Sequence, residues 1–216
     1  RLQHINSTSV GGGVAEILTR MVPLLRDLGM QTTWDVIKGN QAFFGVTKAF
    51  HNALHGGEET ITEEMFDVFR ATTAMNLAEL DTYGDVIVVH DPQPAGLIAR
   101  KPDVGGRWLW RCHIDVSIPD PRVWGFLQDY VTQYDASIFS MPDFAQKLTI
   151  PQYMVPPSID PLSDKNRDLP ADNVRAVVER YGLDPDRPIL TQISRFDRLK
   201  EVALEYAFIL KVFALE

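Results

Sequence analysis

The sequence predicts an α/β fold: a doubly wound, mostly parallel sheet with helices on both faces, followed by the start of a second such domain. The first observation is an alternation of short apolar runs with helical patterns along residues 1–155, which is typical of βαβ units. The second is the run Val-Ile-Val-Val at 86–89, because consecutive β-branched residues indicate a strand buried on both faces. The third is a segment rich in proline and aspartate at 156–173, which we interpret as an exposed linker.

The first half of the chain is expected to begin with two strands and three helices. A strand at 2–6 leads through a loop of Ser, Thr and Gly into a helix at 14–28, whose apolar residues recur at helical spacing. A second strand is expected at 30–37, and two further helices at 41–54 and 60–82. Each strand therefore leads into at least one helix, as a parallel sheet requires.

The second half of this domain continues the pattern. Thr60 and Glu63 fit a capping box at the start of the third helix. The strand at 85–90 should be central, because its apolar run leaves no face for solvent. The remaining strands are expected at 107–113, 136–140 and 150–155, with helices between them at 121–133 and 143–148.

Beyond the linker the sequence offers too little for a second complete domain. The patterns predict a helix at 174–181, a strand at 188–194 and a helix at 200–215. A doubly wound domain needs roughly 100 residues or more. We therefore expect an N-terminal domain at 1–155, a linker at 156–173 and the incomplete start of a second domain at 174–216.

Composition and charge restrict the class of function. Apolar residues make up 45% and charged residues 23% of the 216 residues, which is ordinary for a globular protein. The net charge of −8 disfavours nucleic acid or an anionic membrane surface as a partner. The single cysteine, Cys112, fits a reducing compartment, and no apolar run reaches the ~18 residues of a membrane span. We expect a cytoplasmic protein, and the start at Arg1, without Met or a signal peptide, suggests a fragment or a processed chain.

Ligands of parallel sheets bind beyond the carboxyl ends of the strands, and the first such end carries consecutive glycines. Gly11, Gly12 and Gly13 stand between the first strand and the first helix, where backbone N–H groups can meet an anion. The spacing is neither G-x-G-x-x-G nor a P-loop with its Lys. A tight structural turn is the alternative, but it needs fewer glycines, so we favour contact with a ligand.

Two further strand ends carry histidines. His90 and Asp91 follow the most buried strand, where an imidazole can bind a sugar hydroxyl or transfer a proton. The alternative is a histidine that only satisfies nearby carbonyl groups. His113 follows the next strand, and a structural pair with Asp115, itself capping a turn, is nearly as good an explanation there.

A fourth site follows the linker. Arg195 comes after the predicted strand and Lys200 opens the next helix, an arrangement that suits a diphosphate because Arg binds oxygens in a planar fork and Lys acts as a point charge. A solvated charged turn explains this motif alone equally well.

Other patterns favour no further chemistry. His51 and His55 have the spacing of metal ligands, but no third ligand is close in sequence and no Glu follows His51, so we expect no metal. The sequence has no G-x-S-x-G elbow. Cys112 and His113 are neighbours in a strand and should point to opposite faces, so we expect no Cys–His pair.

Together, these segments resemble retaining nucleotide-sugar glycosyltransferases of the two-Rossmann-domain (GT-B) fold. Within that class they are most similar to the trehalose-forming branch, which contains glycosyltransferring synthases and retaining phosphorylases. The resemblance extends from residue 1 to about 200. It is carried in order by NSTSVGGGVAE at 6–16, WDVIKGN at 34–40, FFGVTKAFHNALHG at 43–56, VHDPQP at 89–94, RCHIDVS at 111–117 and SRFDRLK at 194–200.

The resemblance also implies a role for each residue. It assigns catalysis to His90, Arg195 and Lys200, and substrate binding to Gly11, Gly12, Gly13, Asn40, Asp91 and His113. The glycine loop would contact the donor phosphates, and His90 would lie in the acceptor subsite. Asn40 and His113 would line the acceptor and donor sides of the cleft, and 174–216 would begin a nucleotide-sugar-binding domain.

The implied reaction is transfer of glucose from a nucleoside-diphosphate-glucose to glucose with retention of configuration, which forms trehalose and needs no metal or further cofactor. Retaining glycosidases use a carboxylate nucleophile, whereas in these transferases the leaving phosphate is thought to accept the proton of the acceptor. Arg195 and Lys200 would stabilise the charge that develops on the departing diphosphate.

Two departures from the family leave alternatives open. The Glu-x7-Glu element and the nucleoside pocket of the second domain do not fit in the residues given, and Lys200 is followed by EVALEYAF where the family leads us to expect Asp-Pro. We therefore expect this chain alone to make no measurable trehalose. A trehalose phosphorylase, or a non-catalytic sugar-binding or assembly subunit, remains an alternative, and a homodimer is left open.

Overall fold

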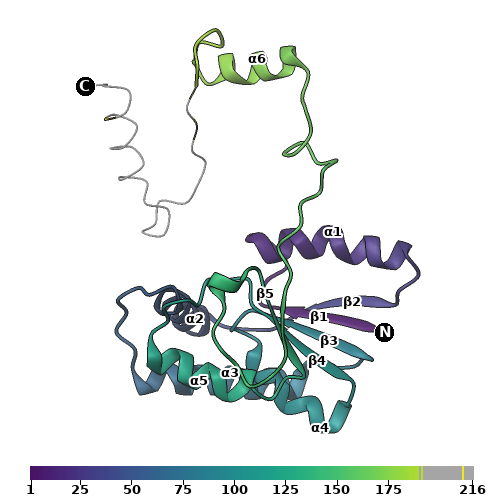
Figure 1. Ribbon diagram of the computed structural model, residues 1–216, viewed down its shortest axis with the longest axis vertical. Coiled ribbons are helices and arrows are strands. Elements are labelled where there is room, and N and C mark those ends of the chain that lie inside the picture. Colours follow the sequence, from purple (N-terminus) through teal and green to yellow (C-terminus); the bar gives the residue numbers. More distant parts are fainter. Residues whose placement is uncertain (190, 192–210, 212–216) are drawn as a thin grey trace. The chain divides into compact units, whose positions relative to one another are not determined.

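Six parallel strands form one sheet in the unit Arg1–Pro161, one of two units into which the chain divides; the other is Leu162–Glu216. A computed structural model describes residues 1–189, 191 and 211. The spatial order of the strands is β2-β1-β3-β4-β5-β6 (Figure 1). Their bounds are Leu2–Asn6 for β1, Thr32–Val36 for β2, Val86–His90 for β3, Arg107–Arg111 for β4, Ala136–Phe139 for β5 and Gln152–Met154 for β6. The parallel sheet and the interior position of β3 confirm the predicted fold class.

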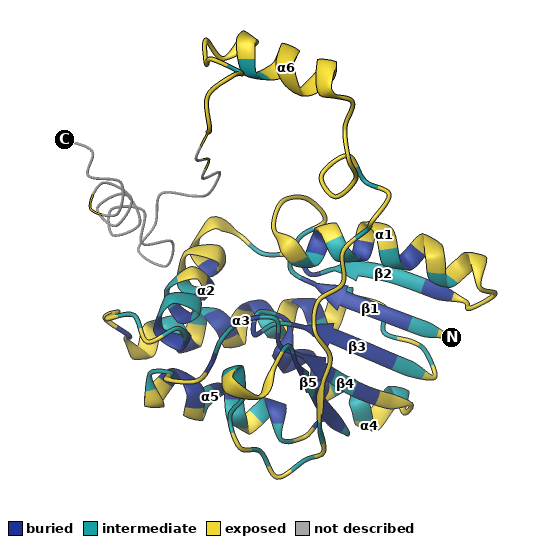
Figure 2. Cartoon of the chain, turned by 45° about the horizontal axis from the view of Figure 1, so that its top comes forward, coloured by how far each residue is buried: buried dark blue, intermediate teal, exposed yellow. Residues whose placement is uncertain are grey.

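The helices lie on both faces of this sheet, and the order of the strands explains how they are distributed. Helix α1 (Gly13–Asp27) connects β1 to β2 on one side of β1, whereas each later crossover steps the other way across the sheet. Right-handed crossovers that step in opposite directions put their helices on opposite faces. The elements on the face opposite α1 are α2 (Gln41–Leu54), α3 (Glu63–Glu79), the 3₁₀ turn η1 (Ala95–Arg100), α4 (Lys101–Val104) and α5 (Pro121–Val131) (Figure 2).

The main core lies between the sheet and α2, α3 and α5. Aromatic side chains dominate it, with Phe50, Phe69 and Trp110 each at most 1% exposed. Ile5 and Val89 point into this core from β1 and β3. Because neighbours in a strand point to opposite faces, the residues before and after them, His4 and His90, point to the face that α1 covers.

Two helices predicted within the first unit differ in the structure. Thr62, not Thr60, is the N-cap of α3, and its N–H donates to Sδ of Met65 at 3.5 Å. The helix starts later because Ile61, directly before the N-cap, is buried in the same core cluster as Phe66, the fourth residue of the helix. This is the arrangement of a hydrophobic staple. The helix predicted at 143–148 is only a 3₁₀ turn, Pro142–Phe144, so that prediction was wrong; Gln146 instead donates to the carbonyl of Val116 at 2.8 Å.

The second unit is described by itself and only in part. Helix α6 spans Ala171–Arg180 and has no buried residue. It begins three residues earlier than predicted, directly after Pro170, whose fixed φ of −55° suits the N-cap position. Most of the strand predicted at 188–194 and nearly all of the helix predicted at 200–215 lie outside the described residues. In the described part of the chain, no helix combines the length and hydropathy that crossing a bilayer requires.

Candidate functional site

Three of the predicted site segments leave the sheet at the same edge. The strands β1, β3 and β4 are adjacent and parallel, and they end at Asn6, His90 and Arg111. The glycine loop, the His90–Asp91 corner and His113 therefore follow three neighbouring strand ends, where parallel sheets bind their ligands.

A chain of three histidines leads from this edge into the sheet. Nδ1 of His90 lies 2.9 Å from Nε2 of His113, and Nε2 of His90 lies 2.9 Å from Nδ1 of His4. The ring centroids are 5.2 Å apart in each pair. His4 and His90 are 4% and 3% exposed, and His113 is half-buried. The structure thus brings His90 and His113 together as expected and adds His4. Of the structural alternative, Asp115 does cap a turn by accepting from the N–H of Ser117 at 2.8 Å, whereas the side-chain partner of His113 is His90.

Burial keeps these imidazoles neutral. It lowers the pKa of His4 and of His113 to about 4, with the charge of Arg111 acting in the same direction on His113. Burial, and then the neighbouring His113 and His4, lower the pKa of His90 well below its usual value. Neutral imidazoles exchange hydrogen bonds with uncharged groups such as sugar hydroxyls.

Asp91 forms a tight corner directly after β3. Its φ of 65° is in the left-handed region, which a non-glycine residue adopts at a cost unless its surroundings hold it there. Here Oδ1 of Asp91 accepts from the N–H of His113 at 2.8 Å, the Asp91 N–H donates to the carbonyl of Arg111 at 2.8 Å, and the Asp91 carbonyl accepts from Nε1 of Trp110 at 3.0 Å. Burial raises the pKa of this carboxyl to about 6, against the effects of the His113 N–H and the Arg111 charge. The corner therefore fixes the backbone of His113.

Arg111 places a buried cation opposite His90 on the adjacent strand. Its guanidinium donates to the carbonyl of Phe139 at 3.2 Å and to that of Val155 at 2.5 Å. These contacts tie the end of β4 to the ends of β5 and β6 and leave the charge 7% exposed. A cation held there favours anionic or oxygen-rich ligands near the edge.

The glycine loop is exposed and anchored at its start. Nδ2 of Asn6 donates to the carbonyl of Thr8 at 2.8 Å, and Oδ1 of Asn6 accepts from Nε1 of Trp34 at 2.8 Å. Gly11 and Gly12 have φ of 71° and 84°, and Gly12 is the N-cap of α1. A Cβ at either position would meet no atom within 4 Å, so the loop presents open backbone beside the helix N-terminus.

Of the two other predicted groups, Asn40 and the pair Arg195 and Lys200, only Asn40 lies among the described residues. Asn40 lies beyond the carboxyl end of β2 and caps α2, with Oδ1 accepting from the N–H of Phe43 at 2.9 Å. Arg195 and Lys200 lie outside the described residues. Their assigned roles therefore remain predictions, as do those of the glycines, His90, Asp91 and His113.

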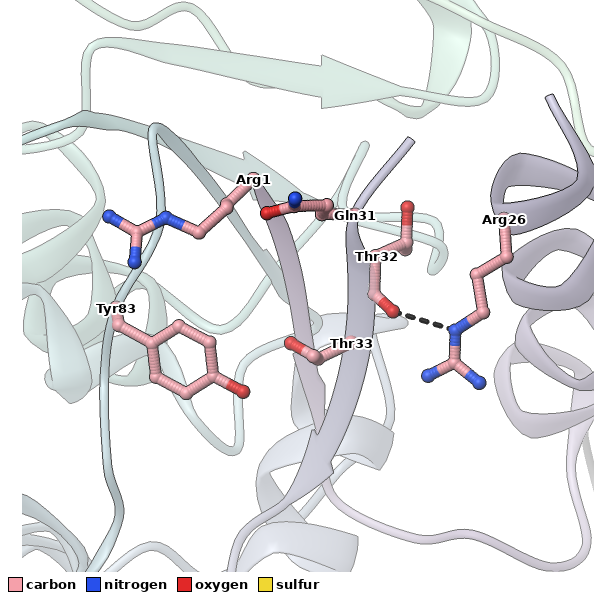
Figure 3. Close-up of a pocket in the computed structure, with 6 residues that line it drawn as sticks. All are labelled: Arg1, Arg26, Gln31, Thr32, Thr33 and Tyr83. Atoms are coloured by element: carbon pink, nitrogen blue, oxygen red, sulfur yellow. Dashed lines mark hydrogen bonds between the residues drawn. The ribbon is translucent and has the colours of Figure 1, made fainter. Parts of the chain in front are cut away.

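The described residues contain no group of three or more His, Cys, Asp or Glu side chains arranged to hold a metal ion. Figure 3 shows a pocket of about 350 Å³, which lies at the amino edge of the sheet. It is lined by Arg1, Arg26, Gln31, Thr32, Thr33 and Tyr83. We leave it outside the candidate site because it lies at the edge opposite the one where parallel sheets bind ligands.

Sequence reasoning missed His4, Asn6 and Arg111. Each lies within or at the end of a predicted strand, on the face opposite the core. The alternation of strand residues would have placed His4 and Asn6 on one face. It could not show that β1 lies beside β3, which is what brings His4 to His90.

Comparisons with known proteins identify the family of the chain. Residues 4–146 match the family model "Trehalose synthase, N-terminal domain". The chain is 47% identical over 207 residues to trehalose synthase of Thermococcus litoralis, covering 92% of this chain and 49% of that protein. It is 43% identical over 208 residues to the trehalose synthase of Rubrobacter xylanophilus, covering 93% of this chain and 50% of that protein. The chain thus spans about half the length of these relatives.

More distant matches define the fold. A trehalose phosphorylase of Pleurotus pulmonarius is 29% identical over 149 residues, which cover 62% of this chain and 20% of that protein. A solved structure entitled "Trehalose-6-phosphate synthase. OtsA" superposes with a TM-score of 0.59 at 13% identity, covering 83% of this chain and 55% of that one. The architecture is thus that of a GT-B Rossmann-like domain, and the family match over residues 4–146 shows that the chain belongs to the trehalose synthase family, of which it carries the N-terminal domain.

Proposed function

We propose that this chain supplies the acceptor side of a retaining glycosyltransferase that moves glucose from a nucleoside-diphosphate-glucose to glucose and so forms trehalose. The observation that carries the proposal is the 47% identity to a trehalose synthase across 92% of the chain. The family match over residues 4–146 contains the glycine loop, His90 and His113, so the segments at the carboxyl edge lie inside the region of similarity.

The geometry of the edge fits both substrates. Neutral His90 and His113 can hydrogen-bond to sugar hydroxyls, while the glycine loop offers backbone N–H groups and a helix N-terminus to the phosphates. In the proposed step the bond from the anomeric carbon to the diphosphate breaks, and a new bond to the acceptor oxygen forms on the same face. The departing phosphate oxygen takes the proton of the acceptor hydroxyl, and Arg195 and Lys200 stabilise its charge.

The two alternatives have less support. The similarity to trehalose phosphorylase covers only 62% of the chain at 29% identity. A non-catalytic sugar-binding subunit would explain the histidine edge but gives no role to the open backbone of the glycine loop at the N-terminus of α1.

The test is trehalose synthesis by the gene-encoded protein that contains this chain. Nucleoside-diphosphate-glucose and glucose are the substrates, and NMR of the product reports its anomeric configuration. We expect α,α-linked trehalose, with turnover lowered about 100-fold by Arg195→Ala or Lys200→Ala and with the KM for glucose changed much less. The 216-residue chain alone, assayed in parallel, should make no measurable trehalose. Release of glucose 1-phosphate from trehalose and phosphate, without synthesis from the nucleotide sugar, would instead establish the phosphorylase.

A further inference from the structure

The histidine chain extends away from the exposed edge to a residue that the proposed reaction does not use. His4 lies in the middle of β1, 4% exposed, and its Nδ1 is 2.9 Å from Nε2 of His90. The other ring nitrogen of His4, Nε2, is buried and has no hydrogen-bond partner in the described part of the chain. A buried imidazole with one free nitrogen needs an explanation, because an unpartnered buried polar group is costly.

The two hydrogen bonds of the chain constrain the protons of all three rings. A neutral imidazole has one N–H and one bare nitrogen, and each of the two bonds, His4 to His90 and His90 to His113, uses one proton. His90 uses both of its nitrogens, so it can donate in only one direction at a time. Two arrangements remain: every ring donates toward His113, or every ring donates toward His4.

The free nitrogen of His4 decides between them. If the rings donated toward His4, its proton would be on Nε2, where a buried N–H would have no acceptor among the described residues. Orphaned buried N–H groups are rarer in proteins than acceptors without a full set of donors. If the rings donate toward His113, Nε2 of His4 is a bare nitrogen beside α1 and no donor is stranded.

We propose that the hydrogen bonds of the histidine chain are donated from His4 to His90 and from His90 to His113, so that His113 presents an Nδ1–H donor at the carboxyl edge. His4 is then the positioning residue that fixes this tautomer of His113. The ligand group that such a donor recognises is an oxygen with a free lone pair on the glucosyl donor. This assignment of a ligand rests on the proposed function, whereas the tautomer itself does not. The pKa values of about 4 for His4 and His113 support neutral rings near pH 7.

The tautomer can be measured directly by ¹⁵N–¹H correlation through two and three bonds of the imidazole rings in the 216-residue chain at pH 7. Of the five histidines, His51 and His55 lie outside the chain of three, and the variants His51→Gln and His55→Gln identify their signals. We expect His113 to be protonated on Nδ1 and His90 on Nδ1. A wild-type His113 protonated on Nε2 overturns the proposal.

Variants of His4 test whether it sets the direction. His4→Phe keeps a ring of similar size but removes the donor, so His113 should change to a mixture of tautomers. His4→Asn, whose Nδ2 can replace the Nδ1 donor, should restore the Nδ1–H form. In the active enzyme, His4→Phe should lower kcat about tenfold with little change in the KM for glucose. An unchanged His113 tautomer in His4→Phe contradicts the positioning role, whereas an enzyme without trehalose activity would contradict only the proposed function.

Discussion

The segments after β1 and β3 both contain residues with positive φ, but different causes allow it in each. Gly11 and Gly12 have φ of 71° and 84° with open space around them. Asp91 has φ of 65° but is a non-glycine residue held by hydrogen bonds to Arg111, Trp110 and His113. The first segment owes its conformation to the absence of side chains, and the second to partners on the neighbouring strand. The glycine loop is therefore a surface that can receive a ligand, whereas Asp91, Trp110 and Arg111 form a frame that holds the histidines in place.

We expect acidification to have the largest effect on stability, because it protonates the buried histidines. The pKa of His4 and His113 is about 4 in the folded chain against 6.5 ordinarily, so the unfolded chain binds more protons between these pH values and the free energy of unfolding falls as the pH is lowered. Asp91 opposes this, because its raised pKa of about 6 lets the folded chain bind a proton more readily between pH 6 and its ordinary value of 3.8. The imidazoles of His4 and His113 alone outweigh this one carboxyl, and His90, whose pKa is also lowered, acts in the same direction.

We therefore expect a net loss on the order of 3 kcal/mol in the free energy of unfolding between pH 6.5 and 4. Urea titrations of the 216-residue chain at several pH values measure it. His4→Phe should flatten the curve, since it removes one titrating group. A wild-type curve that is flat over this range would show that the histidines are not buried as neutral groups.

The next largest effect should come from Asp91, where the two functions of the side chain can be separated. Asp91→Asn keeps an acceptor for the His113 N–H and tolerates left-handed backbone, while it removes a carboxylate that burial disfavours in its charged form. Asp91→Ala loses the acceptor and leaves a non-glycine residue strained. We expect Asp91→Ala to be about 2–3 kcal/mol less stable at pH 7 than Asp91→Asn.

Urea unfolding of both variants measures this difference, and the wild type provides the third comparison. Asp91→Asn should be at least as stable as the wild type at pH 7, because the charged carboxylate is gone. Equal stability of the Ala and Asn variants would mean that the Asp91–His113 hydrogen bond does not hold the corner.

Much of the carboxyl edge could be predicted from the sequence, because short local patterns mark the strands and their ends. The run Val86 to Val89 marks a buried strand by residue type alone, and strand ends in a parallel sheet meet at one edge, so His90 and His113 could be expected to be close. The structure confirms their proximity with a distance of 2.9 Å.

The rest depended on packing between distant segments. His4 reaches His90 only because β1 lies beside β3, 86 residues apart at these two positions. Likewise α3 begins after Thr62 rather than Thr60 because Ile61 is buried in the core, which a capping pattern does not reveal. Local patterns thus identified the strand ends but not the side chains that connect them.

The smallest effect on stability, and the sharpest test of the open surface, should come from the glycine loop. Gly12 combines φ of 84° with ψ of 157°, a region that is essentially restricted to glycine, so Gly12→Ala is strained although no atom lies in the way of its Cβ. Because the loop is exposed and can rearrange, we expect a loss of only about 1 kcal/mol in the free energy of unfolding. The rearranged backbone should nevertheless misplace the N–H groups, and the KM for the nucleotide sugar should rise about tenfold in the active enzyme.

Gly13→Ala is the matched control: it adds the same methyl group to the first residue of α1, also with no atom within 4 Å but without a positive φ. Its stability and KM should stay close to those of the wild type. Equal kinetic effects of the two substitutions would show that bulk near the ligand, and not the conformation of Gly12, limits binding at this loop.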